Sequence, residues 1–160
     1  MTRVAFGIGS NLGDRLAYLQ LAVDRLAAAP GVELVAVSPL YETDPVGGPD
    51  QPDFLNGVVL VDSARTPREL LALGQSIEQA AERVREVRWG PRTLDVDIVV
   101  IEGVAIREPD LEVPHPRAHE RGFVLAPLRD VAPDLAAVLG AGAGTDWPGV
   151  RPSPLQLSLP

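Results

Sequence analysis

The stretch RWGPRTLDVDIVVIE, from Arg88 to Glu102, places two carboxylates, those of Asp95 and Asp97, just ahead of an unbroken apolar run. The β-branched residues after Leu94 predict a β-strand, because such residues are enriched in strands. Side chains of a strand alternate between its two faces, so Asp95 and Asp97 should point to the same side. Two carboxylates this close repel each other, and a divalent cation that prefers oxygen ligands would relieve the repulsion. Mg²⁺ fits best, since it takes one or two protein carboxylates and completes its shell with water and phosphate oxygens.

The two aspartates also have a simpler interpretation, as a solvated strand end that pairs with neighbouring arginines. The context favours a ligand instead. The chain has a formal net charge of -8, yet four arginines crowd into ten residues shortly before the strand: Arg83, Arg85, Arg88 and Arg92. Arginine forks bind phosphate oxygens, and a metal ion held by carboxylates bridges the same phosphates in phosphoryl transfer. The stretch therefore predicts a site for a phosphorylated substrate.

Composition excludes several classes of protein. A length of 160 residues suits one domain. The absence of cysteine excludes a disulfide framework, a thiolate nucleophile and a cysteine zinc site. All 14 basic residues are arginine, which excludes a Walker-A lysine or a lysine Schiff base, although a codon bias toward Arg and Ala is enough to explain this. The acidic balance argues against a general nucleic-acid binder.

The sequence also bears on location. No apolar run approaches the roughly 18 residues that span a bilayer. The first ten residues, MTRVAFGIGS, lack the apolar core and cleavage site of a signal peptide. We therefore expect a cytoplasmic protein with no membrane partner.

Four stretches have the length and β-branched content of strands. The first ends in glycines, and the second is interrupted near Pro39, which suggests an edge strand or a bend. The third and fourth are more continuous. The expected strands are residues 2–9, 32–41, 54–61 and 95–101.

Two stretches carry the three- and four-residue spacing of an amphipathic helix. In the first, Ser10 or Asn11 is expected to cap the helix, and the apolar stripe is Leu12, Leu16, Leu19, Val23 and Leu26. In the second, Thr66, Pro67 and Glu69 have the pattern of a capped helix start. Its buried stripe should be Leu70, Leu73, Ile77 and Ala81.

The resulting order, β-α-β-β-α-β, is that of the ferredoxin-like split unit. It predicts an α+β protein with a mostly antiparallel sheet and both helices on one face. Residues 109–139 should supply a third layer on the other face, through a turn of helix, a strand around Phe123 to Leu125 and a last helix. We expect residues 1–139 to form a single domain, and the Gly- and Pro-rich residues 140–160 to form an irregular tail that Trp147 either anchors or leaves exposed.

Two loops are candidates for movement. Residues 42–52 contain three prolines and two glycines, and are long for a loop without a function. Residues 85–93 place Trp89 among arginines. Glycines and prolines at the ends of both loops would act as hinges for closure over a bound nucleotide.

Four segments resemble the 6-hydroxymethyl-7,8-dihydropterin pyrophosphokinases of folate biosynthesis. They are GSNLGDR (9–15), DQPDFLN (50–56), RWGPRTLDVDI (88–98) and VPHPRAHERGFVLAPL (113–128). The resemblance covers nearly the whole chain up to about Leu139. Its third segment is the most specific, because W-G-P-R and L-D-x-D-I are rarely combined. The fold of that family is ferredoxin-like α/β, in agreement with the order of elements.

The resemblance implies transfer of the β,γ-diphosphate of ATP to the hydroxymethyl group of the dihydropterin, with release of AMP. It also implies that Asp95 and Asp97 hold two Mg²⁺ ions, and that Arg83 and Arg92 join them as catalytic residues on the phosphates. The substrate hydroxyl attacks directly, so catalysis rests on positioning and electrostatics.

The binding residues are implied in the same way. The positions that match ATP-binding residues of the family are Gln75, Glu78, Arg83, Trp89, Arg92, Ile98, His115 and Arg121. Those that match pterin-binding residues are Thr43, Pro45, Val46, Phe54, Asn56, Asp95 and Phe123. Taken singly, either phenylalanine reads as core packing and His115 as a structural histidine. Phe54 and Pro116 stand where some members carry tyrosine, which puts substrate affinity in question.

Two other functions fit parts of the pattern. One is another Mg²⁺-dependent nucleotidyl or phosphoryl transferase with the same aspartates and arginines. The other is a non-catalytic ferredoxin-like module whose Arg88, Trp89 and Arg92 engage nucleic acid. We favour an enzyme that is a monomer and binds small-molecule substrates rather than nucleic acid.

Overall fold

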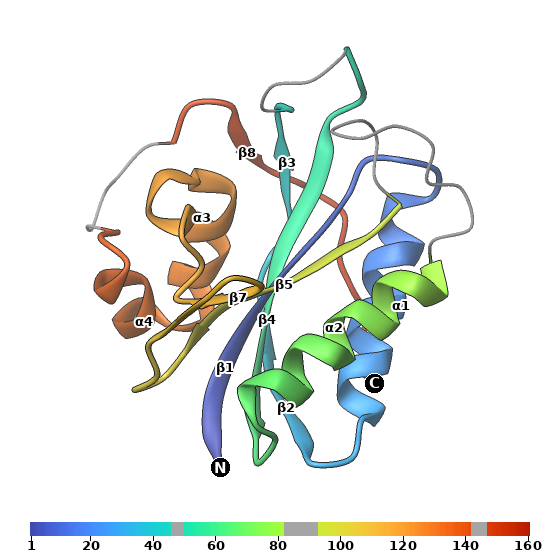
Figure 1. Ribbon diagram of the computed structural model, residues 1–160. Helices are drawn as coiled ribbons and strands as arrows, with labels where there is room; N and C mark the ends of the chain where they lie inside the picture. The colour runs from blue at the N-terminus through green and yellow to red at the C-terminus, as the bar shows by residue number, and fades with distance from the viewer. Residues whose placement is uncertain (46–49, 82–92, 142–146) are drawn as a thin grey trace.

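The computed structural model describes residues 1–45, 50–81, 93–141 and 147–160. Its elements, shown in Figure 1, follow one another along the chain as β1 (Thr2–Ser10), α1 (Arg15–Ala28), β2 (Val32–Val37), β3 (Tyr41–Thr43), β4 (Phe54–Ser63), α2 (Pro67–Ala81), β5 (Asp95–Ile101), β6 (Ile106–Glu108), β7 (Leu111–Val113), the 3₁₀ helix η1 (Ala118–Glu120), α3 (Gly122–Val131), α4 (Pro133–Val138) and β8 (Val150–Pro152). Within the described parts of the chain, no helix has the length and apolar character needed to cross a membrane.

A six-stranded sheet lies at the centre of the molecule. Its strand order is β5-β1-β4-β3-β8, and β2 also pairs with β4. All of these pairings are antiparallel. Because β2 and β3 lie on the same side of β4 and replace one longer strand, the arrangement confirms the predicted ferredoxin-like order.

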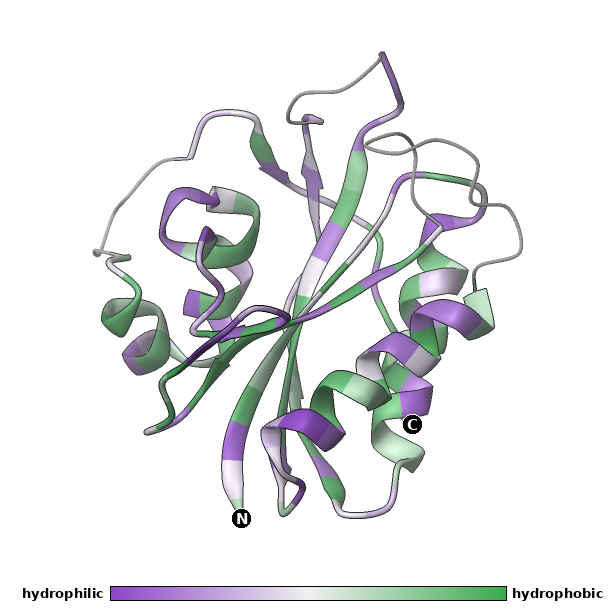
Figure 2. Ribbon diagram, viewed as in Figure 1, coloured by the Kyte–Doolittle hydropathy of each residue, from purple (hydrophilic) through white to green (hydrophobic). Residues whose placement is uncertain are grey.

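Two apolar cores pack on the two faces of the sheet. Helices α1 and α2 cover one face, where Phe6 is fully buried among residues such as Leu26 and Ile77. Helices α3 and α4 cover the opposite face, where Leu128 packs with Val58 and other residues of the sheet. Figure 1 shows the two helix pairs on either side of the sheet, and Figure 2 shows hydrophobic residues along the central strands and on parts of every helix. The predicted third layer is therefore confirmed.

The starts of the two long helices differ in how well the sequence predicts them. The capping box of α2 is confirmed, because Thr66 N–H donates to Glu69 Oε1 at 3.0 Å and Glu69 N–H donates to Thr66 Oγ1 at 3.2 Å. The expected cap of α1 is wrong. Asp14 caps that helix by accepting from the N–H of Ala17, since Ser10 is still part of β1.

The strand expected around Phe123 to Leu125 is also wrong, because these residues begin α3. The apolar residues of this region recur at helical spacings of three and four, and all belong to the core on this face of the sheet: Leu125, Leu128, Ala132, Leu135 and Leu139. The three apolar residues Phe123 to Leu125, taken alone, are compatible with a strand and do not show the helical spacing that continues beyond them.

Four three-residue strands differ from what the sequence predicted. β6 and β7 pair with each other in a separate two-stranded sheet. β3 includes Glu42 and Thr43, which were expected to belong to the loop 42–52. β8 lies in the tail that was expected to be irregular, and it pairs with β3. Three-residue strands depend on a partner strand more than on their own sequence, which explains why the local pattern misses them.

Candidate active site

A cavity of about 860 Å³ opens on the α3 side of the sheet. The ends of the central strands form its floor, and residues from four other segments form its walls. These segments are the end of β3 with the residues after it, the start of β4, residues 115–124 and residues 148–150. A cavity of this size suits a small-molecule site rather than an extended polymer.

Asp95 and Asp97 both line the cavity. The residues between and after them, Val96 and Ile98, lie on the other face of β5, in the core beneath α1 and α2. The alternation along β5 thus places both carboxylates on one side, as the sequence predicts.

Two glycines of β1 lie at the floor of the cavity and leave space there, because they have no side chains. Gly7 and Gly9 pair with Asp97 and Asp95 on one side, and Gly9 pairs with Asn56 on the other. A Cβ at Gly9 would lie 2.4 Å from Oδ1 of Asn56. A side chain at this position would therefore displace the Asn56 amide.

Basic groups face the two aspartates from the segment that leads into α3. His115, Arg117 and Arg121 line the cavity there. The N–H of His115 donates to the carbonyl oxygen of Val99 on β5 at 2.8 Å, which ties this segment to the strand that carries the aspartates. α3 begins at Gly122, so the positive end of its dipole also lies at the cavity.

The charges in the cavity influence one another. Asp97 is exposed to the cavity, but the walls exclude much of its water, and this burial raises the pKa of Asp97. The positive charges of His115 and Arg121 act in the opposite direction on the same pKa. Burial also lowers the pKa of His115, and the charge of Asp97 counteracts that effect. A cation bound beside Asp97 would stabilise its charged form.

Less polar side chains also line the cavity. Phe54 and Phe123 do so together with Thr43, Pro45 and Asn56, and the guanidinium of Arg121 lies 5.4 Å from the centre of the Phe123 ring. The Asn56 amide donates to Oγ1 of Thr43 at 2.6 Å, which holds the amide in place between β4 and β3. Two rings and a fixed amide suit a flat heterocycle with polar edges.

The aspartates fit a magnesium ion better than a metal held entirely by protein. Among the residues that the structure describes, no group of three or more His, Cys, Asp or Glu side chains could hold a metal. Mg²⁺ does not require such a group, because it commonly binds one or two carboxylates and takes its other ligands from water and phosphates. Asp95 and Asp97 provide that donor set.

Comparison with known proteins identifies the family. The family described as 7,8-dihydro-6-hydroxymethylpterin-pyrophosphokinase (HPPK) matches residues 5–133. This chain belongs to the HPPK family. Two curated relatives bear the name 2-amino-4-hydroxy-6-hydroxymethyldihydropteridine pyrophosphokinase. The protein of Methylorubrum extorquens is 50% identical over 84% of this chain and 85% of its own length, and that of Bacillus subtilis is 47% identical over 94% and 90%.

Solved structures show the same fold. HPPK-DHPS of Plasmodium falciparum, solved with pterin and p-hydroxybenzoate, superposes with a TM-score of 0.63 at 16% identity, over 82% of this chain. The matched part is 38% of the solved chain, so this chain spans well under half of that protein. At this identity, the likeness concerns the fold alone.

Most of the HPPK positions expected from the sequence meet at the cavity. Those that line it are Thr43, Pro45, Phe54, Asn56, Glu78, Asp95, Asp97, His115, Arg121 and Phe123. The carboxylate of Glu78 accepts a hydrogen bond from the N–H of Val96 at 2.8 Å, which also ties α2 to β5.

The other expected positions lie elsewhere or cannot be placed. The side chain of Ile98 is buried in the core, and Gln75 is exposed on α2, so neither side chain lines the cavity. Val46, Arg83, Trp89 and Arg92 lie outside the described residues, as does most of the expected loop 85–93.

Several residues line the cavity without having been expected there. Arg117 and Glu120 belong to the segment 113–128, which resembles the HPPK family. Their charge within that segment could have marked them as candidates for the site. Residues 148–150 offered no such signal, because a Gly- and Pro-rich composition does not show what the segment packs against.

Replacing Gly9 by alanine should raise the KM for the pterin more than tenfold and leave the KM for ATP nearly unchanged. The new Cβ would clash with the Asn56 amide in its present place. The amide should therefore lose its hydrogen bond to Thr43 and its present orientation in the cavity. Steady-state kinetics with each substrate varied in turn would measure the effect.

Gly103→Ala is the matched control for this change. Gly103 has a backbone that strains an alanine, with φ +74°, which Gly9 does not, but a Cβ at Gly103 meets no atom within 4 Å and the residue does not line the cavity. The control should lose some stability and keep both KM values. Equal pterin KM values for Gly9→Ala and the unaltered chain would contradict the assignment of Asn56 to the pterin.

Proposed function

We propose that this cavity is the active site for the reaction of the HPPK family. In that reaction the diphosphate of ATP passes to the hydroxymethyl group of 6-hydroxymethyl-7,8-dihydropterin, with release of AMP, in folate biosynthesis. The observation that carries the proposal is the meeting of two kinds of group in one cavity. Two aspartates on the same face of β5 line it, and so do a pair of phenylalanines and an amide held by Thr43.

The pterin would bind against Phe54, Phe123 and Asn56, which all line the cavity. Stacking on the rings fixes the plane of the heterocycle, and hydrogen bonds with the amide and with the backbone near Thr43 fix its rotation in that plane. Bound in this way, the pterin can turn its hydroxymethyl group toward the aspartates. The residues thereby bring the attacking oxygen near the phosphates, which supplies much of the catalytic effect.

The triphosphate would lie between β5 and the start of α3. Arg121 and His115 would donate to phosphate oxygens, and the N-terminus of α3 adds a further positive field. Asp95 and Asp97 would hold Mg²⁺, for which two ions are our expectation. Held by these carboxylates, Mg²⁺ would supply positive charge that stabilises the charge developing on the phosphates during transfer.

The remaining family positions stay predictions. Arg83, Arg92 and Trp89 are proposed as nucleotide-binding residues, the two arginines also as catalytic ones, and Val46 as a neighbour of the pterin. For Gln75 and Ile98, a role in nucleotide binding would have to come from backbone contacts or from a rearrangement on binding. The cytoplasmic location and the monomeric state also stay predictions from the sequence.

An acceptor assay tests the proposal. The chain is incubated with ATP, Mg²⁺ and 6-hydroxymethyl-7,8-dihydropterin, and AMP and the diphosphorylated pterin are measured. We expect both products in equal amounts, and no reaction when EDTA removes the metal. AMP formation with other hydroxyl acceptors but not with the pterin would favour another phosphoryl transferase.

A binding experiment separates the non-catalytic alternative. Calorimetry with a non-hydrolysable ATP analogue should show binding that requires Mg²⁺ and that Asp95→Ala weakens. Salt-sensitive oligonucleotide binding that survives Asp95→Ala, in a chain without pyrophosphokinase activity, would instead support the nucleic-acid module.

A further inference from the structure

The C-terminal segment Trp147–Ser153 forms one wall of the cavity, although it lies beyond the residues that match the HPPK family. Within it, Pro148, Gly149 and Val150 line the cavity directly. The carbonyl oxygen of Gly149 accepts a hydrogen bond from the N–H of Asp44 at 2.9 Å. This wall is therefore joined by backbone to the residue that follows β3.

Both ends of this segment are attached to the body of the protein. At one end, Trp147 packs on the core under α3, and the guanidinium of Arg129 lies 4.7 Å from the centre of its ring. At the other end, Ser153 N–H donates to the carbonyl oxygen of Leu40 at 2.9 Å, and Ser153 Oγ donates to Glu42 at 3.2 Å. The segment is thus held across the edge of the sheet.

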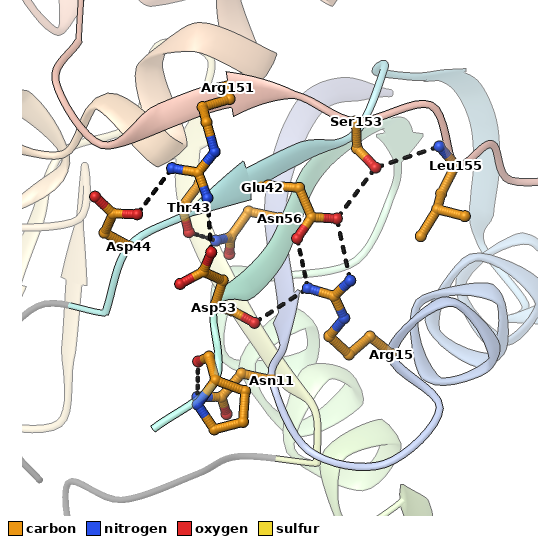
Figure 3. Close-up of polar contacts among 11 residues, drawn as sticks. Asn11, Arg15, Glu42, Thr43, Asp44, Asp53, Asn56, Arg151, Ser153 and Leu155 are labelled. Atoms are coloured by element: carbon orange, nitrogen blue, oxygen red, sulfur yellow. Dashed lines mark hydrogen bonds and ion pairs between the residues drawn. The ribbon is translucent and has the colours of Figure 1, made fainter. Parts of the chain in front are cut away.

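Arg151 lies between these attachments and bridges two carboxylates (Figure 3). Its Nη1 donates to Oδ1 of Asp44 at 2.8 Å, and its Nη2 donates to Oδ2 of Asp53 at 2.6 Å. Asp44 follows β3 directly and Asp53 precedes β4 directly, so one guanidinium joins the two strand ends. Without Arg151, two like charges would face each other there.

These strand ends carry the residues that we assign to the pterin. Thr43 precedes Asp44, Phe54 follows Asp53, and Thr43 and Phe54 pair with each other across the two strands. Arg15 of α1 supports the same place, because it donates to the carbonyl oxygen of Asp53 at 3.1 Å and to Glu42 at 2.6 Å. The metal-binding aspartates, in contrast, lie on β5, which β1 and β4 separate from β3.

We propose that Arg151 is a positioning residue for the pterin: by bridging Asp44 and Asp53, it holds Thr43 and Phe54 in place. Arg151 acts through these residues and does not touch the substrate. This inference rests on the proposed function. The inference predicts that the pterin KM changes more than the ATP KM, because the Arg151 bridge lies at β3 and the start of β4, whereas the aspartates assigned to the metal lie on β5.

Arg151→Ala should raise the KM for the dihydropterin by about three- to tenfold, the range expected for the loss of two partly exposed ion pairs. The KM for ATP should change by less than about twofold. The pterin KM of Arg151→Lys should lie between those of the unaltered enzyme and Arg151→Ala, because lysine keeps the charge but lacks the forked guanidinium. Steady-state kinetics with each substrate varied in turn gives these values, and thermal unfolding shows that each variant is folded.

Arg68→Ala provides a matched control. Arg68 also bridges two carboxylates, Glu108 and Asp110, its side chain is 49% exposed against 48% for Arg151, and it does not line the cavity. This variant should keep both KM values. A general loss of stability would affect Arg68→Ala and Arg151→Ala alike. It would not raise the KM for the pterin while leaving the KM for ATP unchanged.

A double-mutant cycle tests the route of the effect. If Arg151 acts through the two aspartates, adding Arg151→Ala to Asp44→Asn/Asp53→Asn should raise the pterin KM little further. If the unaltered enzyme releases AMP from ATP when the pterin is present, an unchanged pterin KM in the Arg151→Ala variant overturns this inference alone. An unaltered enzyme that does not use the pterin overturns the proposed function instead.

Discussion

Replacing Asp97 by alanine is expected to leave the fold intact and to lower turnover by several orders of magnitude. Asp97 lies on the exposed side of β5 in the cavity, so its loss creates no hole in the core. In our proposal its carboxylate holds the metal that stabilises charge in the transition state, and each tenfold loss of rate is about 1.36 kcal/mol of that stabilisation. Because burial disfavours the charged carboxylate of Asp97, its removal should not destabilise the fold.

The measurement is kcat with saturating ATP and pterin, accompanied by circular dichroism and a thermal melt. Asp62→Ala is the matched control, since Asp62 lies on β4 of the same sheet but does not line the cavity. It should keep nearly full activity. An Asp97→Ala enzyme that turns over at close to the unaltered rate would show that this carboxylate has no part in catalysis.

Replacing Leu128 by alanine is expected to lower the free energy of unfolding by about 2–5 kcal/mol, the range for truncating a buried leucine. Leu128 is fully buried where α3 packs on the sheet. The methyl and methylene groups removed leave a cavity that the sheet on one side and the helix on the other cannot close. Since α3 also carries Phe123 at its start, the loosened helix should weaken pterin binding as well.

Urea unfolding followed by circular dichroism would measure this change. Val138→Ala is the control from the same layer, because Val138 lies on α4 but is 73% exposed. It should change the free energy of unfolding by no more than about 0.5 kcal/mol. Similar losses for the two variants would mean that α3 and α4 do not form a packed third layer.

The sequence predicted the arrangement of the sheet and much of the candidate site. Alternation along β5 was enough to place Asp95 and Asp97 on one face, and the Thr66–Glu69 capping box was enough to start α2. Both depend on interactions within a few residues, which a local pattern records. Where a short apolar run was compatible with either strand or helix, as at Phe123, the local pattern predicted the wrong element.

Long-range packing determined the rest. Nothing local in Val150 to Pro152 predicts a strand, and these residues become one because β3 offers an unpaired edge. Likewise, the sequence gives no sign that Arg151 should bridge Asp44 and Asp53, which lie about a hundred residues earlier in the chain.

The sequence by itself therefore determined which residues are candidates for the chemistry and which face of β5 the two aspartates occupy, because periodicity and capping are properties of neighbouring residues. Only the tertiary structure decided which distant segments close the cavity around them, and that residues 148–150 form one of its walls. The physical reason is that a pairing between remote segments depends on the edges and surfaces that the rest of the fold leaves available.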